Sequence, residues 1–302
     1  MNCVELEALS IAYGDVTALD RLSLNIPEGM IYGIIGPDGA GKTSLMRSIC
    51  TLMPYSEGKI TVLGLDNQKE QKKLRALLGY MPQRFSLYQD LSVEQNIRFF
   101  GRLFGVSKSE MPQRMARLYA FSRLQSFSKR LAGALSGGMK QKLALSCALI
   151  HTPKLMVLDE PTFGVDPVSR QEFWQMLHEL QAEGISIIVS TPYMDEAEQC
   201  DRISLLYKGK IMSEGTPQEI LCQYPLHLYS LQGSDLHQLH RFLLQQPELG
   251  ALQMFGNEIH LSSRQPITAE QFTKWQRECP CLSAWKAIPP TMGDIFLAMM
   301  QQ

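Results

Sequence analysis

The feature that most constrains the fold is a glycine-rich stretch, GPDGAGKTS at residues 36–44, which directly follows the apolar run Ile31–Ile35. A short apolar run bounded by glycine is typical of a strand buried on both faces of a parallel sheet. After the stretch, Leu45, Ile49 and Leu52 recur at helical spacing until the next proline, so we expect a helix there. A strand, a glycine-rich turn and a helix in this order predict an α/β fold with an anion site at the start of the helix.

The residues of this stretch are those that bind the phosphates of a nucleotide. Glycines let backbone amides curl around phosphate oxygens, Lys42 reaches the β- and γ-phosphates, and the Thr43 hydroxyl ligates Mg²⁺. A loop whose glycines only allow a turn is the alternative, and the position between a strand and a helix argues against it. The residues expected to contact the nucleotide are Gly36, Pro37, Asp38, Gly39, Ala40, Gly41, Lys42, Thr43 and Ser44.

A second apolar run, Leu155–Leu158, ends on the acids Asp159 and Glu160. An acid at a strand tip can hold Mg²⁺ through water, and an acid beside it can orient or deprotonate an attacking water. A pair of acids that only caps the following helix is the alternative, and the presence of Lys42 favours the catalytic interpretation. The sequence has no Asn-Lys-x-Asp stretch of the kind that recognises guanine, which argues against a GTPase.

A second glycine-rich helix start, LSGGMKQK, lies at residues 135–142. Such a helix N-terminus binds anions, and one chain needs a second anion site only for a nucleotide that another molecule holds. A plain serine-capped helix start is the alternative for Ser136, Gly137 and Gly138 taken alone. Because LSGGM shortly precedes LMVLDE, the chain resembles the nucleotide-binding subunits of ABC transporters, whose signature closes over the ATP of a facing subunit.

Further motifs follow in the order that this resemblance implies. Tyr13, in IAYGDVTAL, matches the aromatic residue that stacks on adenine, although a lone strand tyrosine more often serves in packing. Gln83, in GYMPQRFSLYQ, matches the glutamine that touches Mg²⁺ and the attacking water and links the site to the membrane subunit. Residues 164–166, Gly-Val-Asp, match the loop that crosses the interface between two subunits. The resemblance covers about residues 1–222.

The fold implied is α/β: a P-loop NTPase of the ABC cassette type over residues 1–222, with a mixed sheet core and a helical signature subdomain at about residues 86–153. The sequence pattern changes around Tyr224-Pro225. Residues 223–302 then alternate strand-like with helix-like pieces, so we expect a small accessory α/β domain there. Nothing in this second domain has catalytic spacing.

The resemblance also implies an ATPase with ATP and Mg²⁺ as its cofactors. Glu160, Gln83 and Lys42 would be catalytic, and Thr43, Gln83 and Asp159 would hold the metal. Two cassettes, identical or different, would sandwich two ATP molecules, each site completed by Ser136, Gly137 and Gly138 of the facing chain.

The expected partners are a second cassette and separate membrane permease subunits. The stretch YMPQRFSLYQDLSVEQNIRFFGRLFGV and the tail PPTMGDIFLAMM resemble the ABC-2 type exporter branch, which includes antibiotic and multidrug efflux systems. The resemblance therefore implies a drug or small-molecule exporter subunit at the cytoplasmic face of the inner membrane. A translation factor of the same superfamily has two cassettes in one chain, and a DNA-repair relative has a long coiled-coil insertion, so neither fits.

One position departs from the family pattern. Where family members have Ser-Thr-His, this chain has Ser190-Thr191-Pro192, after the apolar run at residues 185–189. Proline has no donor to offer the γ-phosphate, and losing one preorganised donor typically costs about 10²–10³ in rate. We therefore expect slow hydrolysis and hypothesise a partner cassette that has its own histidine. The hydroxyls of Thr191 and Tyr193 are candidate substitutes, and a degenerate, weakly hydrolysing regulatory cassette is the alternative.

Composition limits the remaining classes. The formal net charge of −1 leaves no basic surface for nucleic acid, and no apolar run approaches the roughly 18 residues that a membrane span requires. The N-terminal MNCVELEALS does not read as a signal peptide. The seven cysteines are scattered apart from Cys279 and Cys281, and we expect free thiols in a reducing cytosol rather than a metal site.

Overall fold

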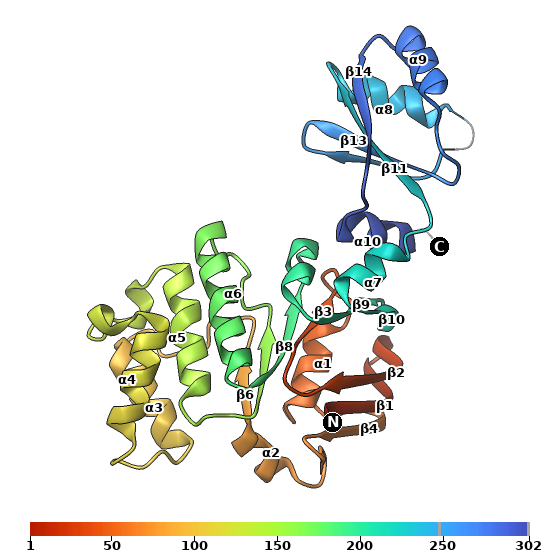
Figure 1. Cartoon of the computed structure of the whole chain (residues 1–302). Coiled ribbons are helices and arrows are strands. Elements are labelled where there is room, and N and C mark those ends of the chain that lie inside the picture. Colours follow the sequence, from red (N-terminus) through yellow and green to blue (C-terminus); the bar gives the residue numbers. More distant parts are fainter. Residues whose placement is uncertain (247–248, 301–302) are drawn as a thin grey trace. The chain divides into compact units, whose positions relative to one another are not determined.

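A computed structural model describes residues 1–246 and 249–300. The chain divides into two compact units, residues 1–217 and residues 218–302 (Figure 1). The boundary lies in the first turn of α7 (Pro217–Cys222), five residues before the domain boundary expected after residue 222.

A mixed sheet forms the centre of the first unit. Its strand order is β10-β9-β3-β8-β7-β6, in which β10 pairs antiparallel with β9 and the other strands pair in parallel. The strands are β3 (Ile31–Ile35), β6 (Leu78–Met81), β7 (Leu155–Asp159), β8 (Ser186–Thr191), β9 (Arg202–Tyr207) and β10 (Lys210–Gly215). Every residue of β3, β7 and β8 is buried, which confirms the prediction that these apolar runs are covered on both faces.

A second, antiparallel sheet has the order β2-β1-β4-β5. Strands β1 (Asn2–Tyr13) and β2 (Val16–Pro27) pair with each other, and β4 (Glu57–Val62) and β5 (Leu65–Asp66) extend the sheet. Apolar side chains of both sheets and of α1 (Lys42–Ile49) share one buried cluster. The start of α1 is therefore held in place by packing against both sheets.

Helix α1 is shorter than the apolar spacing predicts. It ends at Ile49, and Leu52 lies beyond it with 53% of its surface exposed. Thr51 has a left-handed backbone (φ +58°), which is incompatible with a continuing right-handed helix. The expectation that the helix runs on to the proline at position 54 was therefore wrong.

Helices dominate between β6 and β7, as the sequence predicts. Helices α3, α4 and α5 form a group beside the sheet (Figure 1). Ser92 and Ser136 each accept a hydrogen bond from the backbone N–H three residues further on, and they thereby begin α3 and α5. The helices of the first unit, besides α1, are α2 (Gln71–Leu77), α3 (Val93–Leu103), α4 (Met111–Ser122), α5 (Gly137–Leu149), α6 (Pro167–Ala182) and the 3₁₀ helices Gln125–Phe127, Ala132–Ala134 and Met194–Gln199.

The second unit is an antiparallel sheet of order β12-β13-β11-β14 with helices packed against it. Its buried cluster joins Leu231 and Leu261 of the sheet with Phe272 and Trp275 of α9. The elements are β11 (His227–Gly233), α8 (Leu236–Leu244), β12 (Leu252–Phe255), β13 (Glu258–Ser263), α9 (Ala269–Glu278), β14 (Leu282–Ile288) and α10 (Met292–Met300). This architecture has the alternating strand-like and helix-like pieces that the sequence indicates.

The cysteines differ from the expectation of free thiols at one place. Cys279 and Cys281 are joined by a disulfide, and their Cα atoms lie 5.3 Å apart. Both side chains are buried where α9 gives way to β14, and this tight turn brings them together. Cys3, Cys50, Cys147, Cys200 and Cys222 are free.

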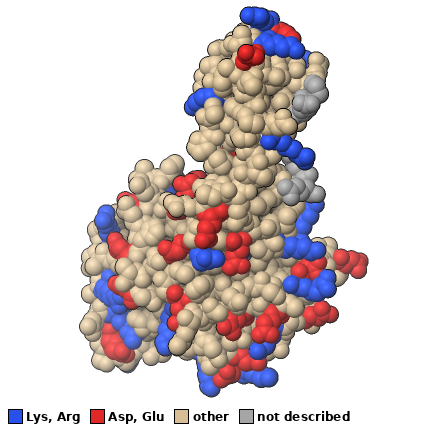
Figure 2. All heavy atoms as spheres, turned by 45° about the vertical axis from the view of Figure 1, so that its right-hand side comes forward, with Lys and Arg blue, Asp and Glu red and all other residues tan. Residues whose placement is uncertain are grey.

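The surface shows no gathering of one sign of charge on the face seen in Figure 2, where Lys and Arg side chains are interspersed with Asp and Glu. This pattern agrees with 29 basic and 30 acidic residues in the sequence. Within residues 1–246 and 249–300, no helix has both the length and the apolar character needed to cross a bilayer.

Phe272 should be essential to the stability of the second unit. Its ring is fully buried and stacks on Trp285 with centroids 3.9 Å apart. Phe272→Ala should lower the free energy of unfolding of this unit by about 3–5 kcal/mol, measured by urea denaturation with tryptophan fluorescence. The exposed neighbour provides the control, because Gln271→Ala should leave the midpoint nearly unchanged. Equal midpoints for the two variants would contradict the assignment of this core.

Candidate active site

The sequence-predicted residues meet at the carboxyl end of the central sheet, which is where ligands bind in open α/β folds. In the β-sheet register, Ile35 of β3 lies beside Thr191 of β8, and Asp159 of β7 lies beside Ser190. The glycine-rich stretch therefore follows β3, which is separated from the acid-bearing strand β7 only by β8.

Lys42 lies at the centre of this edge. Its side chain is 3% exposed, and its ammonium donates to the carbonyl oxygens of Gly36 at 2.8 Å and Pro37 at 3.0 Å. The ammonium also lies 3.0 Å from Oε1 of Glu160. The loop needs glycine at position 41, where φ is +108° and a Cβ would lie 2.5 Å from the carbonyl oxygen of Ala18.

Asp159 is fully buried. Its Oδ1 accepts hydrogen bonds from Ser190 Oγ at 2.7 Å and from Thr43 Oγ1 at 3.2 Å. Burial raises the pKa of Asp159, and the two hydroxyl donors oppose that rise. Its other oxygen, Oδ2, is buried without a hydrogen-bond partner among the described residues.

This arrangement fits Mg²⁺. The unpartnered oxygen of Asp159 and the hydroxyl of Thr43 are hard oxygen ligands on adjacent elements. Within the described ranges no cluster of three or more His, Cys, Asp or Glu side chains forms a metal cage. Mg²⁺ is typically held by one or two carboxylates together with substrate phosphates and water, so a sparse protein ligand set is what it requires.

Glu160 is held on both of its oxygens. Gln83 Nε2 donates to Oε2 at 2.6 Å, and the ammonium of Lys42 pairs with Oε1. The Glu160 backbone is left-handed (φ +49°), and its N–H donates to the carbonyl oxygen of Ser190 at 3.1 Å and to its hydroxyl at 3.0 Å. A non-glycine residue in this conformation is strained, and such strain persists only where surrounding contacts fix it.

Tyr13 flanks the same site. A pocket of about 390 Å³ opens beside Lys42, and 52% of the surface of Tyr13 is exposed at its rim. The Tyr13 hydroxyl lies 3.2 Å from that of Ser44. The pocket is lined by Tyr13, Val16, Thr17, Ala18, Asp38, Gly39, Gly41, Lys42, Thr43, Ser44, Gln83 and Glu160.

The signature residues are not among those that line this pocket. Ser136, Gly137 and Gly138 begin α5, beside the loop that precedes α6. A Cβ on Gly138 would lie 2.4 Å from the Ser169 hydroxyl, so this position requires glycine. The chain thus brings Lys42, Thr43, Gln83, Asp159 and Glu160 together and leaves the signature outside that pocket.

Comparison with known proteins places this chain in a family. A family model described as "ABC transporter" matches residues 19–163. The Nod factor export ATP-binding protein I of Rhizobium etli is 33% identical over 301 residues, covering 99% of this chain and 93% of that protein. The chain belongs to the ATP-binding proteins of ABC transporters.

Another relative is longer than this chain. The probable multidrug ABC transporter ATP-binding protein YbhF of Escherichia coli is 48% identical over 206 residues, which is 68% of this chain and 36% of YbhF. The chain thus matches about a third of the length of that relative.

Solved structures agree with the fold. CbiO1 of Clostridium perfringens, part of the ABC transporter complex cbiONQ, has a TM-score of 0.68 and 28% identity over 74% of this chain and 91% of that one. An ATP-binding cassette solved as a dimer after hydrolysis, with ADP and phosphate, has a TM-score of 0.65 and 26% identity over 70% and 98%. The α/β ABC cassette fold expected from the sequence is therefore confirmed.

The segment expected to depart from the family pattern, Ser190-Thr191-Pro192, spans the end of β8. Thr191 Oγ1 donates to Glu196 Oε2 at 2.5 Å and accepts from the backbone N–H of Tyr193 at 3.1 Å. The guanidinium of Arg170 lies over the Tyr193 ring at 4.3 Å. Of the two candidate substitutes for a histidine, Thr191 is thus engaged through its hydroxyl and Tyr193 through its ring face, and neither lines the Lys42 pocket.

Sequence reasoning missed two residues that hold the site. Ser190 bridges Asp159 and the backbone of Glu160, and Glu196 binds the hydroxyl of Thr191. The only signal for Ser190 is its place at the end of a buried strand, level with Asp159. Nothing in the sequence indicates that Glu196, alone among several acids of its segment, turns inward.

The buried carboxyl of Asp159 should make stability depend on pH. Because its folded-state pKa is raised, the native protein holds this proton more tightly than the unfolded chain. Its contribution to stability therefore falls as pH rises from the ordinary carboxyl value, 3.8, through the raised pKa. Asp159→Asn removes this titration, so the variant should gain thermal stability relative to the wild type as pH rises above the ordinary carboxyl value.

Thermal unfolding midpoints of both proteins, in buffer without Mg²⁺ or nucleotide, measure this difference. The change Asp15→Asn at an exposed turn is the control and should show a nearly constant difference. A gap between wild type and Asp159→Asn that does not widen with pH would contradict the raised pKa.

Proposed function

We propose that this chain is the ATP-binding and ATP-hydrolysing subunit of an ABC exporter that works with separate membrane permease subunits. The contact of Lys42 and Gln83 with the two oxygens of Glu160, beside Thr43 and Asp159, carries the proposal. It brings a phosphate-binding cation, a candidate base and a metal-ligand pair to one sheet edge. The names of the relatives, multidrug transport and Nod factor export, support an exporter.

The chemistry follows from the positions of these side chains. The ammonium of Lys42, now shared between loop carbonyls and Glu160, is the group that phosphate oxygens attract. Its movement to the phosphates leaves Oε1 of Glu160 free to accept a proton from water, while Gln83 keeps the carboxylate oriented. Mg²⁺ on Thr43 and Asp159, when bound, neutralises charge on the β- and γ-phosphates.

In the proposed cycle, dimerisation of two cassettes couples ATP binding and hydrolysis to movement. Ser136, Gly137 and Gly138 lie outside the Lys42 pocket, and in the proposed cycle they bind the γ-phosphate held by a second cassette. Shifting such an equilibrium from 1:99 to 99:1 takes about 5.5 kcal/mol of differential binding. The phosphate loop of one cassette and the signature of the other, both bound to the same γ-phosphate, supply that difference in binding. Hydrolysis of the γ-phosphate removes the difference.

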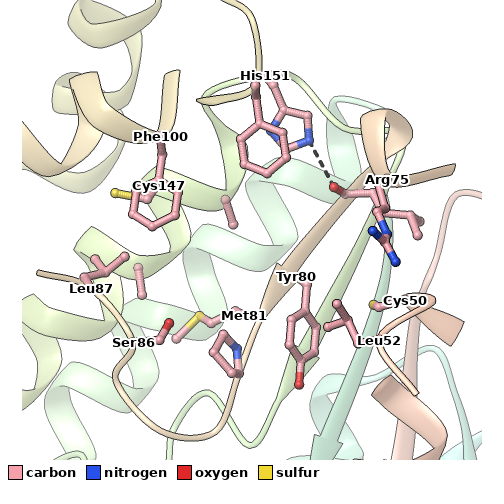
Figure 3. A pocket seen from close by; sticks show the side chains of 15 residues that line it. Cys50, Leu52, Arg75, Tyr80, Met81, Ser86, Leu87, Phe100, Cys147 and His151 are labelled. Atoms are coloured by element: carbon pink, nitrogen blue, oxygen red, sulfur yellow. Dashed lines mark hydrogen bonds between the residues drawn. The ribbon is translucent and has the colours of Figure 1, made fainter. Parts of the chain in front are cut away.

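A groove beside Gln83 is the proposed permease contact. This pocket, of about 260 Å³, lies between β6 and helices α3 and α5, and apolar side chains dominate it (Figure 3). Phe104 stacks on His151 with centroids 4.0 Å apart, and His151 Nε2 lies 3.0 Å from the carbonyl oxygen of Leu78. Burial lowers the pKa of His151, so the imidazole is neutral and suits an apolar partner.

The groove is also connected to the active site, because residues on both sides of Gln83 in the sequence line it. Pro82, Ser86 and Leu87 line it on either side of Gln83. An apolar permease helix seated there would move the segment that holds Glu160. The proposed location at the cytoplasmic face of the inner membrane follows from this contact.

Replacing Pro192 tests the hydrolytic proposal. The wild-type chain should release phosphate slowly and Glu160→Gln should release none. Pro192→His should raise turnover by up to about 10²-fold, because it restores one donor to the γ-phosphate. Phosphate release by the purified full chain measures all three. Full transporter-like rates in the wild type, unchanged in Pro192→His, would refute a weakened site.

A degenerate regulatory cassette is a second candidate, because Pro192 lacks a donor and the hydroxyl of Thr191 is engaged by Glu196. It predicts a stable ATP-bound dimer and no phosphate release in any pairing. Phosphate release that Glu160→Gln abolishes would exclude it.

The permease contact can be tested at the groove. Phe104→Asp places a charge on an apolar surface and should abolish co-purification with the permease, while ATP affinity of the isolated chain stays unchanged. Leu103→Asp is the matched control, since Leu103 is 64% exposed and does not line the groove. Equal retention of permease by the two variants would place the contact elsewhere.

A further inference from the structure

We infer that Glu196 is a positioning residue for the hydrolysis proposed above: its buried carboxylate fixes the end of β8 against the loop that follows Glu160. The inference rests on that proposed function for its activity readout. Its structural readout, described below, is independent of turnover.

Glu196 is a charged side chain that the fold has enclosed. It is 2% exposed, and the two hydroxyls that donate to it belong to Thr162 and Thr191, at most 1% exposed. Thr162 Oγ1 donates to Oε1 at 2.7 Å, and Thr191 Oγ1 donates to Oε2 at 2.5 Å. A carboxylate taken out of water in this way keeps its charge only if such donors are held in place, so each donor and the acid fix one another.

The two donors lie on two different segments next to the catalytic acid. Thr162 follows Glu160 by two residues, in the same loop. Thr191 ends β8, directly after Ser190, whose hydroxyl binds both Asp159 and the backbone of Glu160. Glu196 therefore closes a ring of contacts that includes the left-handed backbone of Glu160, which needs surrounding contacts to persist.

The same ring reaches the phosphate loop and α6. The carbonyl oxygen of Thr191 accepts from the backbone N–H of Gly36 at 3.2 Å. Arg170 of α6 lies 3.6 Å from Glu196 Oε1 and covers the Tyr193 ring at 4.3 Å. One buried acid thus connects the end of β8, which contacts the phosphate loop, with the loop after Glu160 and with α6.

Pro192 makes this connection more important. A side chain at position 192 that bound the γ-phosphate would itself hold the segment over the nucleotide, and proline cannot do so. In this chain the backbone at residues 190–193 is then positioned by the contact of Thr191 with Glu196 rather than by a contact with the nucleotide.

Variants of the ring separate positioning from general stability. Glu196→Ala and Thr191→Val should each lower kcat by about tenfold or more, while the ATP dissociation constant changes by less than about threefold. Glu196→Gln should restore most of the turnover, because its amide oxygen still accepts a hydroxyl. The double variant Glu196→Ala with Thr191→Val should be no slower than Glu196→Ala alone, since Glu196→Ala already breaks the bond from Thr191 as well as that from Thr162.

The exposed acid two residues further on provides the control. Glu198→Ala removes a carboxylate from the same 3₁₀ helix, and it should change neither kcat nor ATP affinity. Turnover, ATP affinity and melting temperature that fall in parallel in Glu196→Ala, without recovery in Glu196→Gln, would overturn the inference in favour of a purely structural role.

Amide hydrogen exchange tests the ring without hydrolysis. In the full chain, Glu196→Ala and Thr191→Val should accelerate exchange in peptides covering both residues 159–166 and residues 190–196, whereas Glu198→Ala should not. Acceleration confined to residues 190–196 would overturn the inference. If the wild type released no phosphate, the proposed function would fail, and this exchange pattern would still decide the role of Glu196.

Discussion

The first unit depends on keeping two adjacent carboxylates, Asp159 and Glu160, buried at the end of one strand. A buried carboxylate is costly unless donors or cations surround it, and removing one partner of such a group costs more than the pair contributes. The donors come from separate elements: Lys42 and Thr43 from α1, Gln83 from the loop after β6, and Ser190 from β8. The strand order and the position of α1 are therefore requirements of these two charges.

The two acids are satisfied in different ways, and their expected chemistry differs accordingly. Glu160 has a partner on each oxygen, and these two contacts fix the direction of its side chain. An oxygen of Glu160 becomes free only when one of these partners moves to another group. Asp159 places both of its hydrogen bonds on one oxygen and leaves the other without a partner among the described residues. The first arrangement suits a base that acts only after phosphate has drawn Lys42 away, and the second suits a fixed metal ligand.

Much of this arrangement could be read from the sequence, because it is local. The glycine-rich stretch, the acids after an apolar run and the buried strands are each encoded within a few residues. The antiparallel sheet of β1 and β2 was harder, since left-handed residues at Ala8 and Arg21 and shifts in register interrupt its alternation. The end of α1 depends on the backbone at Thr51, and the disulfide on a turn that joins α9 to β14. Contacts between distant segments, such as Thr162 with Glu196, have no local pattern at all.

Proline at position 192 therefore has a different meaning in the structure than in the sequence. In the sequence it marks a missing donor, which indicates a weak site. In the structure the segment around it is firmly held, because Thr191 is bound through its carbonyl to Gly36 and through its hydroxyl to Glu196. A degenerate site that had lost its role would have little reason to keep a buried acid with two matched donors next to the catalytic loop. The arrangement favours a site that lacks one donor to the nucleotide but keeps the contacts that hold residues 190–193 in place.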